Sequence, residues 1–574
     1  MGRRSDTPDS ALRSGPPADA APGVRAVGCT AGGAPVGLAG TFTSARMLVE
    51  TVCSCGGRHV PPAGSETESA PVVVGPFASA GRLAQTWADP ATGTLGRGAL
   101  SQTRLYYEVT DGPGPDERLV RFSTDLADLA GPRSAMWPAA VAASLAGETL
   151  PMPLTPYEGI FQLACGTTLG TSGGRERLTL DEFDLADLAD QARRITGRPT
   201  DPHEVLRRAL RHAVDEALAF TGAHGVLGDG GGFGAAALAA VAPARLRRLH
   251  VHLDVPILDR RRGRLAAGVK VIDGTAHWHR ACDTPWFGSA MDGDPWPPAP
   301  GLLRSTAWEA TPLLSGAGLV GLFTGPADTP GRLRTGWRQL TMAAPFPTLF
   351  GHPGWRAWSP PRDDDPPPSQ GPGDPADAPD PLRPGGWISP AVAQAGVAVT
   401  SARTSSHLVP IVDDTTGAVP GAASLQTVID LLERPPRAPG DHRLDPVLVC
   451  AHPVVLGAAV LLARHGRLRL RRRDGYVHRA PLLRDLVPAG PLPADVTPAE
   501  REGLLAAAYV TRRLAAPARR AALLAQVEGS PWVLPDRLRA VLADSRRMLA
   551  DARALQRLCV TAARHPGPPT GGRS

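Results

Sequence analysis

Short apolar or alternating runs, separated by glycine, proline and aspartate, fill the chain from about residue 24 to residue 178. The runs at 72–74, 104–109 and 119–122 are examples. Runs of this length, bounded by turn-forming residues, are typical of β-strands. The pattern predicts a sheet-rich α+β domain with short helices between its strands.

Beyond residue 198 the apolar positions change to helical spacing. Asp201 is the predicted N-cap, Pro202 occupies the first helical position, and Glu204 completes a capping box. The apolar positions that follow share one predicted buried face of a helix over 202–219. They are Val205, Leu206, Ala209, Leu210, Ala213, Val214, Ala217 and Leu218.

Apolar runs then alternate with helical stretches, at 249–253, 269–272 and 319–323. Such alternation predicts an α/β layer with a mostly parallel sheet. The segments 424–432 and 446–462 also have the apolar content of ordered structure.

The last part of the chain is predicted to be helical. Thr497, Pro498 and Glu500 repeat the cap signature and open a helix that runs to about residue 513. A second helix is expected from about residue 535 to residue 563. Its predicted inner face consists of Leu538, Val541, Leu542, Met548, Leu549, Ala552, Leu555 and Cys559.

A glycine-rich loop at 225–238 follows the first long helix. A short apolar run enters this loop and a small-residue helix pattern leaves it. In a strand–loop–helix unit of this kind, backbone N–H groups at the helix start can cradle phosphate. The candidate nucleotide-binding residues of the loop are Leu227, Gly230, Gly231, Gly232, Phe233, Gly234 and Ala235.

Composition places the domain boundaries. The polar segments 1–23 and 566–574 are predicted to be disordered tails, and 359–386 is a flexible insertion because it is rich in proline and aspartate. Between them lie two predicted units, 24–178 and 199–565.

Charge and targeting signals narrow the partners. A net charge of +6 over 574 residues is modest and disfavours a nucleic-acid binder. The densest basic run, 464–473, fits a solvated helix or hairpin rim, or a contact with an acidic peptide, phosphate or nucleic acid. No signal peptide opens the chain and no apolar run is long enough to span a membrane, so we expect a cytoplasmic protein without a membrane partner.

Metal-ligating residue types cluster between positions 250 and 283. Two interpretations stay open: a metal site, or polar residues at the rims of short strands. The residues are His250, His252, Asp254, His277, His279, Cys282 and Asp283. The seven scattered cysteines contain no pair of Cys-x-x-Cys units, which argues against a zinc ribbon.

Several stretches together resemble the asparagine synthetase family, and in particular its macrolactam-forming branch of β-lactam synthetases and lasso-peptide cyclases. Residues 119–129 are similar to a strand of the glutaminase-like domain, and 155–160 with Cys165-Gly166-Thr167 to the stretch that ends in its Pro-Gly-His turn. The helix at 202–219 with the glycine-rich loop is similar to the start of the synthetase domain. Thr324 to Asp328 is similar to the Thr-Gly-Tyr-Gly-(Ser/Ala)-Asp loop, and 476–493 to the segment before the last helices.

The resemblance implies a fold and a reaction. The fold would be a glutaminase-like (Ntn-type) α+β sandwich, followed by an adenine-nucleotide α-hydrolase-like synthetase domain with a parallel sheet and C-terminal helices. The family uses ATP and magnesium to adenylate a carboxylate, and an amine then displaces AMP to form an amide. Gly2 stands where asparagine synthetases have their nucleophilic cysteine, so glutamine hydrolysis is not expected.

The same resemblance implies a damaged synthetase site. Of the two magnesium-binding aspartates, the first falls at Gly234 and the second at Asp328, while Pro326 replaces a tyrosine. Thr324 and Gly325 complete the second predicted nucleotide loop. The catalytic lysine falls at Glu502, with Arg501 as the adjacent positive charge.

Three functions therefore follow as expectations. The favoured one is a catalytically degenerate macrolactam (lasso peptide) cyclase type of ATP-dependent amide ligase, in natural-product biosynthesis. The alternatives are an active peptide cyclase with a rebuilt magnesium site and a non-catalytic partner of an intact paralogue. The expected partners are a precursor peptide or a partner biosynthetic enzyme.

Overall fold

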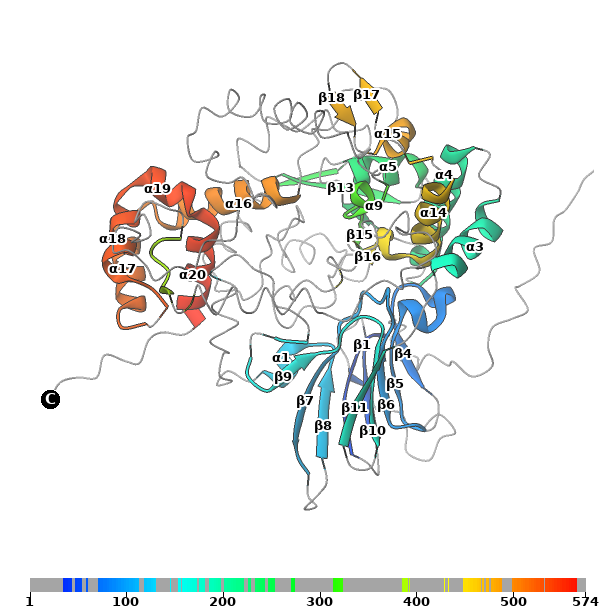
Figure 1. Ribbon diagram of the computed structural model, residues 1–574, viewed down its shortest axis with the longest axis horizontal. Helices are drawn as coiled ribbons and strands as arrows, with labels where there is room; N and C mark the ends of the chain where they lie inside the picture. The colour runs from blue at the N-terminus through cyan, green and yellow to red at the C-terminus, as the bar shows by residue number, and fades with distance from the viewer. Residues whose placement is uncertain are drawn as a thin grey trace, which may run out of the picture.

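The chain folds into an antiparallel β-sandwich, a parallel sheet covered by helices, and a C-terminal helical bundle (Figure 1). The computed structural model of the chain describes residues 35–43, 47–53, 58–59, 71–112, 118–130, 145, 153–155, 157–172, 175–180, 185–197, 201–220, 226–228, 233–242, 246–252, 270–273, 313–323, 385–390, 392, 428, 432, 447–465, 467–468, 471–473, 476–478, 480–487, 498–530 and 532–564.

The sandwich contains two antiparallel sheets. The six-stranded sheet has the order β3-β2-β1-β8-β7-β9, and the five-stranded sheet has the order β11-β10-β6-β5-β4. The strands are β1 (Pro35–Phe42), β2 (Met47–Cys53), β3 (Arg58–His59), β4 (Val72–Val74), β5 (Thr86–Asp89), β6 (Thr94–Arg97), β7 (Tyr106–Asp111), β8 (Arg118–Ser123), β9 (Ile160–Gln162), β10 (Thr167–Ser172) and β11 (Arg175–Leu180). The strands predicted at 72–74, 104–109 and 119–122 correspond to β4, β7 and β8.

The inner faces of the two sheets share one core. Leu38 and Phe122 from the six-stranded sheet pack with Leu95 and Leu169 from the five-stranded sheet, and all four are almost fully buried. Alternate residues of β8, such as Val120 and Phe122, point into this core, which is the expected pattern for a half-buried strand. Two short helices accompany the sheets, the 3-10 helix η2 (Ala78–Ala84) and α1 (Leu126–Leu129).

The second layer is a five-stranded parallel sheet with the order β14-β13-β12-β15-β16. In chain order this reads 3-2-1-4-5, the order of a doubly wound sheet. Its strands are β12 (Val226–Gly228), β13 (Arg247–His252), β14 (Lys270–Asp273), β15 (Leu313–Ser315) and β16 (Val447–Leu448). The mixed α/β fold class with a parallel sheet is thereby confirmed.

Helices and one hairpin surround this sheet. They are α3 (Leu185–Thr196), α4 (Pro202–Phe220), α5 (Phe233–Val241), α9 (Leu319–Leu322), η6 (Val449–Ala451), α14 (Pro453–Arg464), α15 (Pro481–Leu486) and the hairpin β17 (Arg471–Arg473) with β18 (Tyr476–His478). All residues of α14 up to Leu462 are buried, because this helix packs against both α3 and α4. Gly457 permits the closest approach: a Cβ there would lie 2.1 Å from the carbonyl oxygen of Leu188 on α3.

The C-terminal bundle consists of α16 (Pro498–Arg513), α17 (Pro517–Val527), α18 (Pro535–Ala543), α19 (Ser545–Ala550) and α20 (Ala552–Arg564). The helix predicted from residue 498 to about 513 is confirmed as α16. The single helix expected over 535–563 is wrong, because Asp544 and Asp551 interrupt it and divide it into three. Asp544 ends one helix and caps the next, since its Oδ1 accepts the N–H of Arg546 at 2.8 Å. Leu549, expected on the inner face, is 36% exposed.

Two other predicted runs have a different structure. The apolar run at 319–323 was expected among the sheet-forming runs, but it forms the short helix α9. The strand of this region is β15, which begins six residues before α9. The basic run at 464–473 divides between the end of α14 and the hairpin strand β17, so it matches the hairpin interpretation in its second half.

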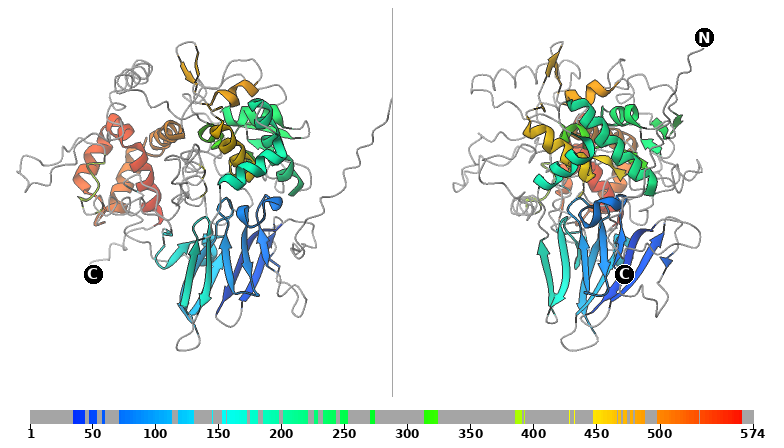
Figure 2. Two further views of the ribbon diagram at one scale, coloured as in Figure 1. Left: turned by 45° about the vertical axis from the view of Figure 1, so that its right-hand side comes forward. Right: turned by 90° about the vertical axis from the view of Figure 1, so that its right-hand side faces the viewer.

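The sandwich and the parallel sheet meet in a polar junction. The Gln102 amide donates to the carbonyl of Leu448 at 2.9 Å, and its Oε1 accepts the Leu448 N–H at 2.7 Å. Arg97, fully buried, donates to the carbonyls of Leu163 at 3.0 Å and Leu432 at 2.8 Å. Figures 1 and 2 show the sandwich below the parallel-sheet layer, with the C-terminal helices as a group beside them.

None of the helices that the structure describes is long and apolar enough to cross a membrane.

Candidate functional site

The strand order of the parallel sheet reverses at β12, and the strand ends at this point are here called the crevice. β12 pairs with β13 on one side and with β15 on the other, all in parallel. In open α/β sheets, ligands bind beyond the carboxyl ends of the two strands that flank this switch point. The chain leaves β12 toward α5 and leaves β15 toward α9, so these two strand ends form the candidate site.

The two glycines at these strand ends are in backbone contact. A Cβ added to Gly234, in the first turn of α5, would lie 2.1 Å from the carbonyl oxygen of Gly316. A Cβ added to Gly316, directly after β15, would lie 2.3 Å from the carbonyl carbon of Gly234. Real Cβ atoms are not found at such distances, so neither position can carry a side chain in this arrangement.

The connection after β15 is itself a tight turn. The Oγ of Ser315 accepts the Ala317 N–H at 3.2 Å, and Gly318 adopts a left-handed φ of +81° before α9 begins. The N–H of Leu322 donates to the carbonyl of Gly318 at 2.9 Å. The sequence signal for this turn is Ser-Gly-Ala-Gly at 315–318, directly after two leucines. No role was predicted for these residues from the sequence.

The structure places part of the predicted nucleotide site at this crevice. Leu227 lies in β12 and pairs with both neighbouring strands, Phe233 begins α5, and Gly234 and Ala235 are buried in its first turn. The remaining predicted residues do not join them within the described chain. Gly230, Gly231, Gly232, Thr324, Gly325 and Asp328 lie outside the described residues, and Arg501 is a residue of α16 whose side chain is not described.

The predicted histidine cluster is only partly described. His250 and His252 lie in β13, two residues apart and therefore on the same face of the strand. Asp254, His277, His279, Cys282 and Asp283 lie outside the described residues.

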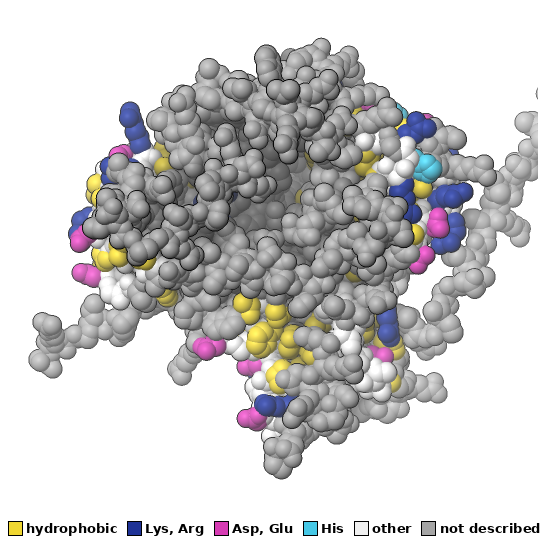
Figure 3. Space-filling model, in the orientation of Figure 1, with side chains coloured by type: hydrophobic (Ala, Val, Ile, Leu, Met, Phe, Trp, Pro, Cys, Tyr) yellow, Lys and Arg dark blue, Asp and Glu magenta, His cyan; other side chains and the backbone are white. Residues whose placement is uncertain are grey.

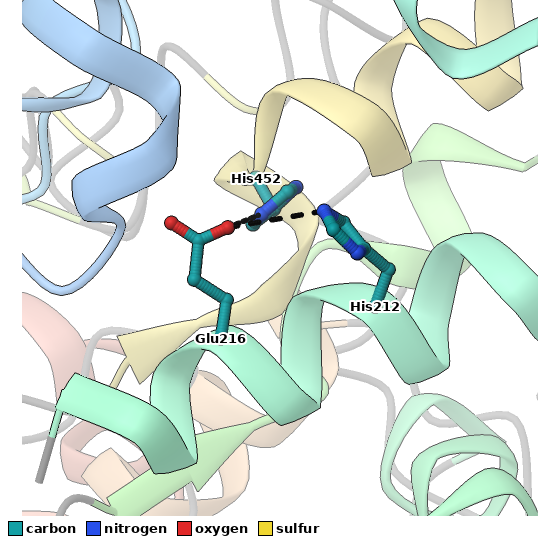
Figure 4. A group of neighbouring side chains, drawn as sticks. All are labelled: His212, Glu216 and His452. Atoms are coloured by element: carbon teal, nitrogen blue, oxygen red, sulfur yellow. Dashed lines mark hydrogen bonds and ion pairs between the residues drawn. The ribbon is translucent and has the colours of Figure 1, made fainter. Parts of the chain in front are cut away.

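A different histidine cluster, which was not among the residues predicted from the sequence, lies at the junction of α4, α14 and the sandwich. His212, Glu216 and His452 place one nitrogen or carboxylate oxygen each within 4.8 Å of one another (Figure 4). His452 Nε2 lies 2.9 Å from Glu216 Oε2, and His212 Nε2 lies 3.9 Å from the same oxygen. The i, i+4 spacing of His212 and Glu216 on one helix was a readable signal, but His452 is remote in sequence.

The hydrogen bond at the second ring nitrogen of His452 determines which tautomer its ring adopts. His452 is the N-cap of α14, and its Nδ1 accepts the backbone N–H of Val454 at 3.1 Å. A neutral imidazole that accepts at Nδ1 carries its proton on Nε2. Nε2–H therefore donates to the Glu216 carboxylate, and this nitrogen offers no lone pair to a metal.

The cluster also connects the parallel-sheet layer to the sandwich. The ring of Phe77 meets that of His452 edge-on, with centroids 4.6 Å apart, and the ring of His212 lies 5.5 Å away on a second edge-on contact. Burial lowers the pKa of His212, against the opposing effects of Glu216 and Asp215. His212 is thus held toward its neutral form. The donor set has the composition of a metal site, but its hydrogen bonds are those of a structural junction.

Charges on the described surface are mixed. On the face shown in Figure 3, acidic and basic side chains alternate over the C-terminal helices and over the helices of the parallel-sheet layer. The described part of this face therefore has no single-sign stripe of the kind that binds a nucleic-acid backbone.

No protein-family model matches the sequence, and no curated protein matches it either.

Proposed function

We propose that this protein is a catalytically degenerate amide ligase of the asparagine synthetase type, which serves as a non-catalytic binding partner in peptide macrolactam (lasso peptide) biosynthesis. The order of layers supports the proposal. An antiparallel sandwich precedes a 3-2-1-4-5 parallel sheet, and helices follow, which is the sequence of units that the resemblance implies. The two described flanks of the glycine-rich loop, β12 and the start of α5, lie at the switch point of that sheet, where such a synthetase would bind ATP.

The observation that carries the proposal is the contact between Gly234 and Gly316. Gly234 occupies the position that the resemblance assigns to the first magnesium-binding aspartate. A side chain there has no room, because its Cβ would overlap the backbone after β15. Transfer of AMP from ATP to a carboxylate, with release of pyrophosphate, needs cations and donors to offset the developing charge. This position can supply neither a ligand for magnesium nor a side-chain donor.

The second predicted loop, Thr324 to Asp328, lies outside the described residues. The described turn that precedes it follows β15, and there the Ser315 hydroxyl is used within its own turn. The described residues at this sheet edge therefore do not fit magnesium, and we derive no ATP-dependent step.

Nucleotide binding tests the proposal directly. Isothermal titration of the full chain with ATP and excess Mg²⁺ is expected to show no heat of binding at millimolar nucleotide. Incubation with ATP, Mg²⁺ and a short precursor peptide is expected to release no pyrophosphate above a no-enzyme control. The active-cyclase alternative requires pyrophosphate release that disappears in Asp328→Ala, and that result would overturn the proposal.

The partner role is tested separately. Affinity purification of the tagged chain from its native cells is expected to recover an amide ligase with an intact Ser-Gly-Gly-x-Asp-Ser loop. Recovery of the chain alone, at physiological ionic strength and without a nucleotide-binding activity of its own, would remove the support for a partner role.

A further inference from the structure

A short segment remote in sequence is inserted into the C-terminal bundle. Residues 385–389, here called the strap, lie against the turn between α17 and α18 (Figure 1). Leu534 N–H donates to the Trp387 carbonyl at 2.7 Å, and Ser389 N–H donates to the Trp532 carbonyl at 2.9 Å. Ile388 and Val533 form an antiparallel bridge. These are the contacts of an extended peptide added beside a strand.

One side chain of the strap enters the bundle completely. Trp387 is 1% exposed and packs into the bundle core, and its indole Nε1–H donates to Asp551 Oδ2 at 3.0 Å. The other carboxylate oxygen of Asp551 accepts the Gly385 N–H at 2.7 Å. Arg537 of α18 donates to the Gly386 carbonyl at 3.2 Å. The groove therefore buries the strap's tryptophan and forms hydrogen bonds with four backbone groups of the strap. One carboxylate of the groove, that of Asp551, accepts from both the tryptophan and the backbone of the strap.

The helices α16 to α20 supply most of the core into which the strap inserts. The residues that they supply are Ala506, Tyr509, Val510, Leu514, Leu523, Val527, Leu538, Val541, Leu542, Met548, Ala552, Leu555, Leu558, Cys559 and Ala562. The strap adds Trp387 to this core and packs Ile388 against it, and Leu145, Val392 and Val533 also belong to it. Buried tryptophans are frequent anchors of binding interfaces.

We propose that the groove formed by α18, Asp551 and residues 532–534 is a recognition site for an extended peptide in which two glycines precede a tryptophan, and that the strap is its releasable occupant in cis. The occupant's chemistry follows from the strap that fills the groove. The site lies on a different part of the fold from the crevice of the parallel sheet, so it holds whether or not that crevice binds nucleotide.

Asp551 joins the strap to the bundle through both of its carboxylate oxygens. Burial raises the pKa of the Asp551 carboxyl to about 6, against the opposing effects of the Gly385 N–H and the Trp387 indole. The two strap donors therefore favour the charged carboxylate, which accepts both hydrogen bonds.

The test uses the full chain with the strap displaced. Gly385→Pro removes the N–H that Asp551 accepts and cannot adopt the φ of +77° found there. Trp387→Ala removes the anchor and serves as an independent second variant. The probe is a fluorescein-labelled synthetic peptide of residues 383–391, with the same peptide carrying Trp387→Ala as the matched control. Fluorescence anisotropy gives the affinity, and circular dichroism with a thermal melt reports folding.

The expected result has three parts. Both displaced-strap variants bind the peptide at least about tenfold more tightly than the wild-type chain does, because a covalently attached occupant competes at high effective concentration. The control peptide binds about thirtyfold more weakly, as loss of an aromatic anchor implies. Asp551→Asn in either variant weakens peptide binding about tenfold, because an amide side chain accepts only one of the two hydrogen bonds that the carboxylate accepts.

Three results would overturn the proposal. In the first, both variants stay folded and bind no peptide. In the second, both lose the cooperative unfolding of the bundle, which makes the strap an inseparable part of the core. In the third, the variants form dimers by sedimentation, which makes a second copy of the chain the occupant.

Discussion

Gln102 and Leu448 exchange two hydrogen bonds, at 2.9 and 2.7 Å, as two paired strand residues would. Gln102 belongs to the sandwich and Leu448 to β16, the last strand of the parallel sheet. A side-chain amide thus completes the edge of a sheet in another layer. This relationship makes the junction specific, because a buried backbone N–H and C=O left without partners are costly.

Gln102→Ala is expected to lower the free energy of unfolding by about 2 kcal/mol, since both backbone groups of Leu448 lose their partner. Urea unfolding at 25 °C measures the change. Gln191→Ala, at a half-buried glutamine of α3, is the matched control and is expected to cost less than about 0.5 kcal/mol. Equal losses in the two variants would remove the special role of Gln102.

Gly234→Ala and Gly316→Ala are each expected to cost about 3 kcal/mol, because the added Cβ overlaps backbone atoms that cannot move aside as a side chain can. Gly93→Ala is the control: its φ is +61° but a Cβ there meets nothing within 4 Å, so only about 1 kcal/mol of backbone strain is expected. Gly234→Asp should likewise destabilise the chain and restore no MgATP binding. A stable Gly234→Asp protein that binds MgATP would contradict the close contact.

Gly457→Ala tests the crossing of α14 and α3. Helix propensity alone predicts that alanine stabilises a mid-helix glycine site by about 1 kcal/mol. We expect the opposite sign, a loss of about 2 kcal/mol, because the Cβ would lie 2.1 Å from the Leu188 carbonyl oxygen. Ala463→Gly, in the last turn of α14, sets the scale of the propensity effect in the same unfolding assay. A stabilised Gly457→Ala variant would show that the helices can separate.

His452→Ala is expected to cost about 3 kcal/mol, because α14 loses its N-cap and Glu216 loses its donor. His452→Asn should recover about 1 kcal/mol of this loss, since an asparagine side chain can cap the helix. His212→Ala is the control, with an expected loss below about 1 kcal/mol for a partner 3.9 Å from the carboxylate.

Zinc distinguishes this junction from a metal site. A tenfold excess of Zn²⁺ is expected to leave the melting temperature of the wild-type chain unchanged, because Nε2 of His452 is a donor. A rise in melting temperature that disappears in His452→Ala would show that the metal displaces the cap.

Asp551 makes stability depend on pH in a defined direction. Its pKa is raised from 3.8 to about 6 in the folded chain, so the folded state binds more protons than the unfolded state between these values. Its contribution is therefore fully present below about pH 4 and is lost as the pH rises through about 6. The loss amounts to about 3 kcal/mol. Urea unfolding of the wild type and Asp551→Asn from pH 4 to pH 8 isolates this group, and parallel curves for the two proteins would contradict the assignment.

Local signals in the sequence were sufficient to predict a helix and its first residue where the capping residues and the apolar periodicity agree. Asp201 was the predicted N-cap, and its Oδ1 accepts the N–H of His203 at 2.9 Å at the start of α4. Glu204 does not complete the predicted capping box through its side chain, which pairs with Arg207 and Arg208. The two arginines lie one helical turn after Glu204, and they bind its carboxylate in place of the backbone N–H at the N-cap.

The errors arise where the sequence pattern has two solutions. A five-residue apolar run such as 319–323 fits a buried strand or a buried helical turn equally well, and burial of Leu319 and Leu322 against the core selected the helix. The helical pattern at 535–563 continues through Asp544 and Asp551, but each aspartate makes hydrogen bonds that end a helix or bind another segment.

Contacts between remote segments could not be predicted at all. His452 meets Glu216 across 236 positions, and Gln102 meets Leu448 across 346. Gly234 and Gly316 bring the strand ends together, but they carry no side chain, so the sequence marks them only as glycines. Their contact follows from the strand order, which makes β12 and β15 neighbours.

The strand order also governs when the molecule can be completed. β15 and β16 are neighbours in the parallel sheet, yet the whole stretch from residue 316 to residue 446 separates them. During synthesis, β12, β13, β14 and β15 leave the ribosome long before β16 and α14, which supply the sheet edge and the central buried helix. Until those segments arrive, the growing chain exposes an unfinished sheet and the apolar faces of α3 and α4, a state that is prone to aggregate.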